Sequence, residues 1–418
     1  MVIKCDVLVV GAGPAGNSAA RAAAEAGART ICIDKKKEIG RPVQCAEGIG
    51  TYLFPLLPFR IPKEQLIWEI KGISFWAEGL TVERRGGFWS GYAINRANFD
   101  TWLATLAVNA GAKLQLEAEL VDMEFNDEYH VTKAIVKNGH DQLEIEPTIV
   151  IAADGVDSTV LDLLKLKKNS TGIVGEIKSY EMHNLHLDKP YDDQIFLGDF
   201  APGAYGYIFP KSKTTANVGT GFLFPRKKLD HCFAEFLEVP IVKRQLSNAK
   251  ALEEKSGHVP ICRLADKWVY GNVLLAGDAA NQNIKPLVEG FLPAIICGDI
   301  AGKVARKYLT KNGALSNYPY DIDSKLGLFF KESNAFLNVA YNLLKSEDQK
   351  DKLLLLGLNS NVFSSKKIEK LKRENYETLR QRLIGWNNSK IQQAFTNLSE
   401  KKHSTAQTSI FPFASERK

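Results

Sequence analysis

The start of the chain carries an apolar, small-residue, apolar pattern that predicts a strand, a helix and a second strand. An apolar run from Val7 to Val10 is typical of a buried strand, and the alanine-rich stretch from about Asn17 to Ala26 favours a helix. A second run, Arg29 to Ile33, predicts another buried strand. We therefore expect a βαβ unit over residues 1–34.

Further along, alternating and periodic segments predict both strands and helices. Strands are expected at 67–70, 73–76, 91–94, 113–116 and 129–136, over 175–225 with Gly and Pro breaks, and as buried runs from 148 and from 273. Helices are expected at 96–110, at 291–309 and from 324 onward. Asn95 precedes the first of these helices and is its expected N-cap.

These elements predict an α/β fold in which one domain is split by another. At 418 residues the chain is long enough for two or three domains. We expect a Rossmann-type dinucleotide-binding domain, an inserted antiparallel-sheet domain that binds substrate, and a helical C-terminal region. The predicted bounds are 1–164 and 261–310 for the two parts of the first domain, 165–260 for the inserted domain, and 311–418 for the helical region.

The turn between the first strand and the first helix reads Gly11-x-Gly13-x-x-Gly16. Gly11 permits a tight turn, Gly13 lets the backbone approach a pyrophosphate, and Gly16 lets helix and strand pack closely. Asp34 follows the second strand, about 20 residues beyond the glycines, where a carboxylate can bind a ribose hydroxyl. A glycine triplet alone also occurs in ordinary turns, but strand, helix and acid in this order favour a dinucleotide site.

Composition limits the classes of protein that the chain can represent. With 45% hydrophobic and 24% charged residues it is typical of a globular protein, and it has no apolar run of about 18 residues that predicts a transmembrane helix. The first strand begins too early to leave room for a signal peptide. None of the six cysteines forms a C-x-x-C pair and the seven histidines do not cluster, so we expect a reduced, cytoplasmic protein with no metal site.

Positive charge is concentrated near the end of the chain. The net charge is +6, while residues 365–418 carry 12 Lys and Arg against 5 Asp and Glu, or +7. Such a segment is either a solvated helix face or a surface attracted to anionic lipid head groups, which would make the protein peripheral to a membrane. No recognition motif accompanies the charge, so nucleic acid is not an expected partner.

Several segments together carry a family resemblance. The glycine turn, Ala153-Asp154-Gly155 and Gly277-Asp278-Ala279-Ala280 resemble the FAD-dependent enzymes related to the aromatic hydroxylases. Pro42-Val43-x-Cys45-x-Glu47-Gly48 and Pro202-Gly-Ala-Tyr205-Gly-Tyr207-Ile-Phe209-Pro210 are similar to two motifs of the archaeal geranylgeranyl reductases. Members of that family saturate isoprenoid double bonds of membrane lipids, and the resemblance covers roughly residues 1–310.

The resemblance implies FAD as cofactor and assigns its contacts. They are Gly11, Gly13, Ala15 and Gly16 at the pyrophosphate, Asp34 at the adenosine ribose, Cys45, Ala46 and Gly48 against the flavin, Arg96, the Leu120 backbone at the adenine, Asp278 at the ribityl or pyrophosphate region, and Gly290 and Phe291 at the isoalloxazine oxygen. Tyr205, Tyr207 and Phe209 alternate along a predicted strand, so they are expected to form an aromatic wall for an apolar chain, or to pack as core; Pro210 ends this substrate motif.

Two positions depart from the family pattern. The family usually has Trp where this chain has Tyr207, and Gly where it has Val288 in Lys285-Pro286-Leu287-Val288-Glu289-Gly290-Phe291. A Cβ at position 288 is expected to crowd the isoalloxazine ring. These departures bear on the shape of the substrate space rather than on flavin binding.

The implied reaction pairs hydride transfer from reduced flavin with protonation of the other carbon of an isolated double bond. The sequence offers no obvious proton donor; Cys45, the candidate nearest the predicted flavin face, is either catalytic or a packing thiol. No second glycine fingerprint occurs, so NADPH docking transiently or a ferredoxin is the expected electron donor. Alternatives are an FAD-dependent monooxygenase or another flavin oxidoreductase on a small apolar substrate, a flavoprotein that relays electrons to a quinone, and a homologue without enzymatic activity.

Overall fold

A computed structural model describes residues 2–127, 129–139, 141–166, 174–223, 228–261 and 265–399. The first sheet is built around β1 (Val2–Val10), as the N-terminal apolar pattern predicts. Its path runs in the order β17 (Val269–Tyr270), β18 (Val273–Leu275), β11 (Asp141–Ala152), β1, β2 (Thr30–Ile33) and β8 (Lys113–Gln115), with β9 (Ala118–Asp127) and β10 (His130–Asn138) attached beside β11. The pairs from β18 to β8 are parallel, as a Rossmann-type sheet requires.

The first helix, α1 (Pro14–Glu25), starts three residues earlier than the alanine pattern predicts. Pro14 occupies its first turn, where a missing N–H costs nothing and the fixed φ already suits a helix. The helix α2 (Arg96–Asn109) begins as predicted, because the Asn95 side chain accepts a hydrogen bond from Asn98 N at 3.0 Å. The helix α6 (Phe291–Leu309) has the predicted bounds.

The second sheet follows the predicted inserted segment but also draws on the first part of the chain. Its order is β16 (Lys250–Pro260), β12 (Val174–His183), β15 (Thr215–Phe222), β14 (Gly206–Pro210), β13 (Asp192–Phe196), β5 (Gly72–Ala77) and β6 (Leu80–Arg85). β5 and β6 come from the segment predicted to belong to the dinucleotide domain. They join through a parallel β13–β5 pair, while the other pairs of this sheet are antiparallel.

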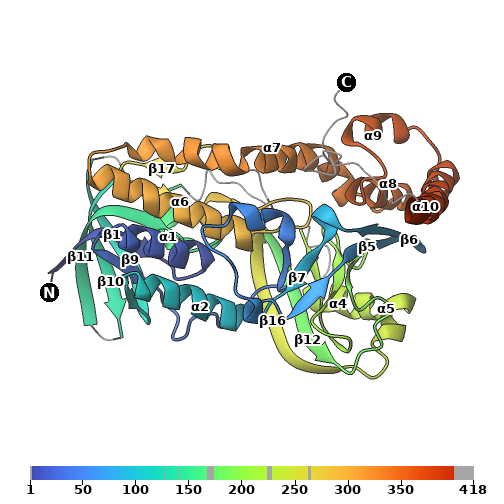
Figure 1. Cartoon of the computed structure of the whole chain (residues 1–418), viewed down its shortest axis with the longest axis horizontal. Helices are drawn as coiled ribbons and strands as arrows, with labels where there is room; N and C mark the ends of the chain where they lie inside the picture. The colour runs from blue at the N-terminus through green and yellow to red at the C-terminus, as the bar shows by residue number, and fades with distance from the viewer. Residues whose placement is uncertain are drawn as a thin grey trace.

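A third, small sheet and several helices complete the fold. The small sheet contains β3 (Gly48–Gly50), β7 (Gly91–Ala93) and β4 (Trp68–Ile70). The remaining helices are α3 (Thr159–Leu163), α4 (Leu229–Glu238), α5 (Pro240–Gln245), α7 (Tyr318–Lys345), α8 (Gln349–Asn359), α9 (Ser365–Leu371) and α10 (Tyr376–Ser399). Figure 1 shows α7 lying along α6 and reaching toward α8, α9 and α10, which gather at the end of the molecule away from the N-terminus.

Two glycines allow α6 to lie directly against α1. A Cβ at Gly298 would lie 2.1 Å from the carbonyl oxygen of Ala15, and one at Gly302 would lie 2.3 Å from that of Ala19. Without side chains at these positions the two backbones approach closely, and the helices share the largest core cluster of the described residues. This contact fixes the start of α6 relative to the start of α1.

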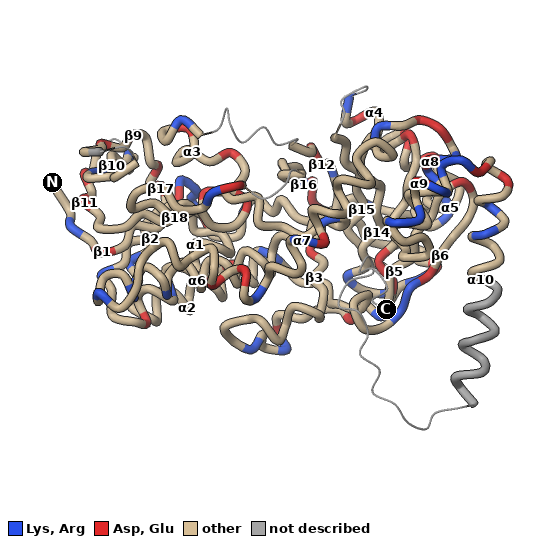
Figure 2. Tube along the Cα trace, turned by 90° about the horizontal axis from the view of Figure 1, so that it is seen from above, with Lys and Arg blue, Asp and Glu red and all other residues tan. Residues whose placement is uncertain are grey.

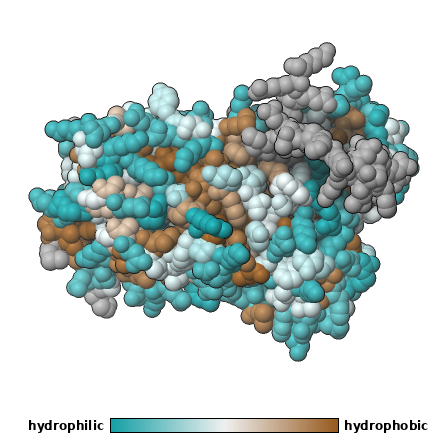
Figure 3. Space-filling view, in the orientation of Figure 1, coloured by the Kyte–Doolittle hydropathy of each residue, from teal (hydrophilic) through white to brown (hydrophobic). Residues whose placement is uncertain are grey.

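The surface in view in Figure 3 is mostly hydrophilic, with hydrophobic residues showing in its middle. Within the described ranges, no helix combines the length and apolar character that a membrane crossing demands.

Candidate active site

One long cavity, of about 590 Å³, extends from the glycine turn to the second sheet. Residues of the first sheet and its loops line part of it, among them Gly11, Asp34, Leu120 and Asp278. Residues of the small sheet, the second sheet and the segments beside them line the rest, among them Ile49, Ile73, Trp89, Tyr205 and Phe209. The cavity therefore offers a polar, glycine-rich part and an apolar, aromatic part without a wall between them.

The glycine turn has the geometry that its spacing predicts. Gly11 has a φ of +96°, and a Cβ there would lie 2.4 Å from Ala153 O. A Cβ at Gly16 would lie 1.7 Å from Gly11 O, so this glycine is needed for the turn itself. A Cβ at Gly13 would meet no atom within 4 Å, because it would point into open space beside the cavity. The backbone at Gly13 can therefore approach a bound group.

Two helices begin at this cavity. Pro14 and Ala15, at the start of α1, and Gly290 and Phe291, at the start of α6, all line it. The first N–H groups of a helix lack partners within the helix and attract anionic or electron-rich groups. Because the close contact between α1 and α6 holds both helices in place, the N-termini of both helices point toward the same cavity. This arrangement suits a phosphate-bearing cofactor with a carbonyl-rich ring at its other end.

Asp34 is placed at the end of β2 beside this turn. Its Oδ2 accepts a hydrogen bond from Ala12 N at 2.7 Å, and its Oδ1 accepts one from Lys36 N at 2.9 Å. The carboxylate therefore braces the glycine turn, and it also lines the cavity. Each of its oxygens has further capacity to accept a bond from a ribose hydroxyl.

Cys45 lies in the loop before β3, on the wall of the cavity. Its Sγ accepts a hydrogen bond from Glu47 N at 3.2 Å, and the thiol forms no disulfide. Nearby, the guanidinium of Arg96 binds Asp100 at 3.0 and 2.8 Å and lies 4.4 Å from the centre of the Phe291 ring. Arg96 is thus held in place by the protein's own side chains, between α2 and the start of α6.

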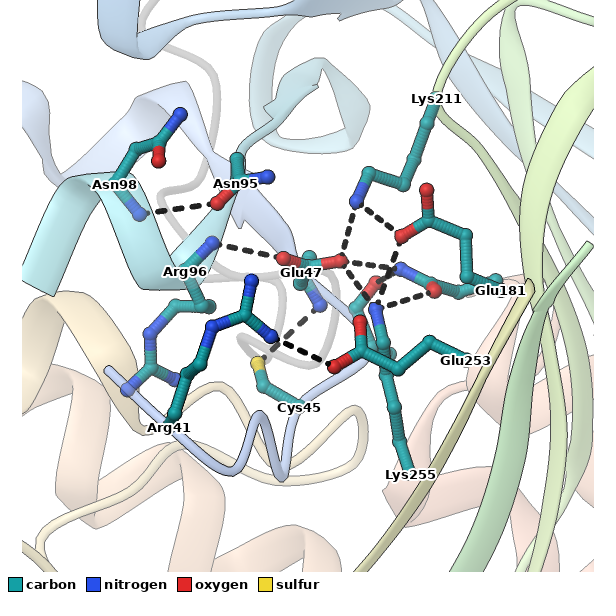
Figure 4. A network of polar contacts seen from close by, with 12 residues as sticks. Arg41, Cys45, Glu47, Asn95, Arg96, Asn98, Glu181, Lys211, Glu253 and Lys255 are labelled. Carbon is teal, nitrogen blue, oxygen red and sulfur yellow. Dashed lines mark hydrogen bonds and ion pairs between the residues drawn. The ribbon is translucent and has the colours of Figure 1, made fainter. Parts of the chain in front are cut away.

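Glu47, two residues beyond Cys45, is the centre of a buried polar network (Figure 4). Its Oε1 accepts a bond from Arg96 N at 2.7 Å. Its Oε2 accepts bonds from Lys211 Nζ at 2.6 Å, Lys255 Nζ at 2.7 Å and Asn217 Nδ2 at 3.0 Å. Glu47 and Lys255 are each almost fully buried, so these charges are compensated by one another rather than by water.

The network keeps the Glu47 carboxyl ionised. Burial by itself raises the pKa of Glu47, but the positive charges of Lys211 and Lys255 outweigh it and lower the pKa to about 2. A second carboxylate, Glu181, accepts bonds from the same two lysines at 2.7 and 3.2 Å. The two lysines are therefore matched by two carboxylates.

The predicted aromatic wall forms on one face of β14 and the residue before it. The ring centres of Tyr205 and Tyr207 lie 6.2 Å apart, and those of Tyr207 and Phe209 lie 4.8 Å apart. All three line the cavity, whereas Pro210 is buried outside it. The Tyr205 hydroxyl also donates a hydrogen bond to Leu287 O at 2.9 Å, which ties the wall to the loop before α6.

Comparison with known proteins agrees with these features. Residues 176–259 match a family described as the geranylgeranyl reductase catalytic domain, and residues 6–56 match an FAD binding domain. The chain is 35% identical over 326 residues to the digeranylgeranylglycerophospholipid reductase of Methanococcus aeolicus, covering 77% of this chain and 81% of that protein. The protein of the same name from Methanocaldococcus jannaschii is 38% identical over 314 residues, covering 73% and 78%.

The chain belongs to the geranylgeranyl reductase family. A crystal structure of a geranylgeranyl bacteriochlorophyll reductase-like protein from Thermoplasma acidophilum superimposes with a TM-score of 0.77 at 26% identity, covering 92% of this chain and all of that one. A flavin-dependent brominase, at a TM-score of 0.65 and 16% identity, shares the fold alone. This geranylgeranyl reductase is an FAD-dependent oxidoreductase, and the glycine turn with its two helix N-termini fits that cofactor.

Most of the residues predicted for this reductase line the one cavity. The exceptions are Gly16 and Pro210. The fold brings all the others together on the cavity wall: Gly11, Gly13, Ala15, Asp34, Cys45, Ala46, Gly48, Arg96, Leu120, Tyr205, Tyr207, Phe209, Asp278, Gly290 and Phe291. Their individual roles stay predictions. Among the described residues, no group of three or more His, Cys, Asp or Glu side chains is placed to hold a metal ion.

Sequence reasoning missed several polar residues of the reductase. The Glu47 network is completed by Lys211, directly after β14, by Asn217 of β15 and by Lys255 of β16. Asp193 and Glu289 line the cavity. No spacing signal connects these residues, because they come from segments far apart in the chain.

Val288, where the reductase family usually has glycine, adopts a left-handed backbone conformation with a φ of +56°. This region is unfavourable for a β-branched residue. The conformation persists because both sides of the loop are held: Tyr205 binds Leu287 O, and the Glu289 carboxylate accepts bonds from Tyr52 and from Gly50 N. Val288 lines the cavity, so its side chain takes up space that a glycine would leave open. That it crowds the isoalloxazine ring stays a prediction.

We predict that Val288→Gly stabilises the reductase by about 1 kcal/mol, because the strain of a left-handed valine exceeds the entropy cost of glycine. Urea unfolding of the flavin-loaded protein measures the change. Asn281→Gly is the matched control: Asn281 has the same φ of +56°, but asparagine tolerates it, so a change of only a few tenths of a kcal/mol is expected. A loss of stability in Val288→Gly would contradict the strain argument.

We also predict that Glu47→Gln destabilises the reductase by about 3 kcal/mol at neutral pH, because buried lysines lose the carboxylate that compensates them. Glu253→Gln is the control, since its ion pair with Arg41 at 3.2 Å is exposed and is expected to contribute less than about 1 kcal/mol. Urea unfolding of both variants gives the comparison.

The contribution of Glu47 to the free energy of unfolding should depend on pH. The pKa of Glu47 is lowered from 4.5 to about 2 in the folded protein, so its stabilising effect is present above the unfolded value and is lost as pH falls toward 2. The difference in unfolding free energy between wild type and Glu47→Gln should shrink between those two pH values. A difference that stays constant across this range would show that the charge of Glu47 is not what stabilises the fold.

Proposed function

We propose that this protein saturates the geranylgeranyl chains of an archaeal-type glycerophospholipid. This is the substrate class named in its relatives from Methanococcus aeolicus and Methanocaldococcus jannaschii. The observation that carries the proposal is the single cavity, in which the glycine turn and an apolar aromatic space are continuous. An isoprenoid chain is apolar along its whole length, so it can replace water in a space lined by Ile49, Ile73 and Trp89.

Reduced FAD supplies a hydride when it is bound. The protein supplies the rest: the helix starts and the glycine turn hold the cofactor, the aromatic wall orients the chain, and the apolar lining excludes water from the double bond. Tyr205 has two parts in this arrangement, because its ring faces the cavity while its hydroxyl holds the loop that carries Val288.

An anaerobic turnover tests the proposed function. The flavin of the purified protein is reduced with dithionite, a digeranylgeranyl glycerophospholipid is added, and the lipid is followed by mass spectrometry. We expect a gain of two hydrogens for each bond reduced, together with the return of the oxidised flavin spectrum. A flavin that bleaches but keeps its electrons in the presence of the lipid would reject this substrate. Oxygen-dependent consumption of NADPH with a small aromatic compound would favour a monooxygenase instead.

We predict that Tyr205→Ala lowers the rate of lipid-dependent flavin reoxidation by about tenfold or more while the flavin content stays that of wild type, because the ring forms the wall. Tyr205→Phe keeps the ring and loses only the bond to Leu287 O, so it should retain most of the rate. If both variants lose flavin in proportion to activity, Tyr205 acts in folding rather than on the substrate.

The electron donor is the other partner that the reaction needs. Either NADPH docking transiently or a reduced ferredoxin would fill this role, and each is tested by adding it anaerobically to the oxidised protein. Bleaching of the flavin by one donor and not by the other identifies the partner.

We further propose that the protein meets its lipid at an anionic membrane surface through α9. Lys366, Lys367 and Lys370 are exposed on this helix, and Figure 2 shows basic segments around it. Lysines near an anionic bilayer each contribute about 1 kcal/mol of attraction, which salt screens. The basic residues beyond 399 lie outside the described residues.

We predict that the triple variant Lys366→Glu, Lys367→Glu and Lys370→Glu sediments with anionic phosphatidylglycerol vesicles far less than wild type. A control with the same change in charge, Lys213→Glu, Lys243→Glu and Lys250→Glu, alters exposed lysines elsewhere and should bind like wild type. Equal loss in both sets would mean that net charge, and not the α9 surface, sets membrane attachment.

A further inference from the structure

Asp193 is a carboxyl group placed on the wall of the apolar part of the cavity. It lies on β13, between β5 and β14 of the second sheet. Asp193 pairs with Ile73 on β5, and Ile195 pairs with Tyr207 on β14, so Asp193 stands on the same face as the aromatic wall. Its neighbours on that face are apolar or aromatic.

The small sheet leaves room for this carboxyl. A Cβ at Gly48 of β3 would lie 3.5 Å from Asp193 Oδ2 and 3.5 Å from the Phe209 ring. Gly48 follows Cys45 by three residues, so the carboxyl faces the segment that is predicted to lie against the flavin. The Asp193 side chain is therefore close both to the aromatic wall and to the predicted reaction face.

No structural role accounts for the Asp193 carboxyl. Over the described ranges, no residue donates a hydrogen bond to it and no cation pairs with it. Its neighbour Asp192 differs: that side chain points to the other side of β13, is almost fully buried, and binds Arg85 at 2.7 Å. A carboxyl that has no partner and faces an apolar space is destabilised as an anion.

A protonated acid in this position is what the reduction needs and what the sequence alone did not supply. Burial, with a smaller contribution from the negative charge of Asp192, raises the pKa of Asp193 to about 8. Other titratable groups around it on the cavity wall are Cys45, Glu47, Tyr52, Tyr205, Tyr207 and Glu289, together with the cations Arg96 and Lys285. Arg96 is paired with Asp100, and neither cation is among the causes that set the pKa of Asp193. This upward shift of the pKa favours the neutral form of the acid.

Glu289 is the competing acid, and its surroundings favour a different role. Burial raises the pKa of Glu289 to about 7, against the hydrogen bonds from Tyr52 and Gly50 N. Those two donors, at 2.7 and 3.2 Å, hold the carboxylate and the loop before α6 in place. Glu289 thus has a structural function in this loop, whereas Asp193 has none.

We propose that Asp193 donates the proton that completes the reduction of the isoprenoid double bond. The inference rests on the proposed function. One carbon of the double bond takes up the hydride that reduced flavin supplies, and the other carbon takes the proton of the Asp193 carboxyl. The π bond is lost, two C–H bonds form, the flavin is oxidised by two electrons, and the Asp193 carboxylate regains its proton from water.

The test compares Asp193→Asn with Asp192→Asn in the flavin-loaded protein. Asparagine keeps the shape of the side chain but has no acidic proton, so lipid-dependent flavin reoxidation in Asp193→Asn should fall about 100-fold or more. Flavin content and reduction by dithionite should not change. Asp192→Asn alters the neighbouring acid on the opposite side of the strand and should stay within about threefold of wild type.

Two readouts separate a proton donor from a packing residue. The wild-type rate should fall as pH rises through about 8, because the donor is then ionised, and this fall should be absent from Asp193→Asn. Infrared difference spectra of wild type against Asp193→Asn, recorded at pH 7 without lipid, should show the carbonyl stretch of a protonated carboxyl.

Two results would overturn the inference: an ionised Asp193 at pH 7 in the infrared spectra, or turnover in Asp193→Asn within about threefold of wild type. A larger loss in Glu289→Gln than in Asp193→Asn, at equal flavin content, would assign the proton to Glu289 and overturn it as well. If wild type itself never passes electrons to the lipid, the proposed function fails and this inference fails with it.

Discussion

The carboxylate of Glu47 connects parts of the protein that are far apart in the chain. It receives the first backbone N–H of α2, and it also receives two lysines and an asparagine from the second sheet. The loop that holds Cys45 is therefore fixed between α2 and the second sheet. Because these charges are buried, each depends on the others, and the position of the Cys45 loop follows from their balance.

A second constraint is the contact between α1 and α6, where glycines let the backbones touch. The helices start at the same cavity, so one packing contact places two sets of unpaired N–H groups around the cofactor site. The Tyr205–Leu287 bond then links that end of the site to the aromatic wall. The glycine-rich part and the aromatic part of the cavity are thus connected by a few short contacts, with no wall between them.

Local patterns were enough to predict the elements that carry the cofactor. The glycine turn, Asp34, the Asn95 cap and the bounds of α6 all depend on residues close together in sequence, and the structure confirms their geometry. The pairing of β5 with β13 was not predictable in this way, because the two strands are more than a hundred residues apart and no pattern within either strand identifies its partner. Asp193 was missed for the same reason: its environment is created by Gly48, Ile73 and Phe209, which the fold brings together.

The apolar part of the cavity has a consequence for a substrate with several double bonds. In the proposed function the place of reaction lies between Cys45 and the start of α6, whereas a polyisoprenoid carries its double bonds at regular intervals along one chain. Walls of Ile49, Ile73 and Trp89 offer a hydrophobic contact that has no direction and no register. For the proposed substrate, such a lining would allow the chain to shift lengthwise by one isoprene unit after each reduction, so that one reaction centre would reach successive double bonds.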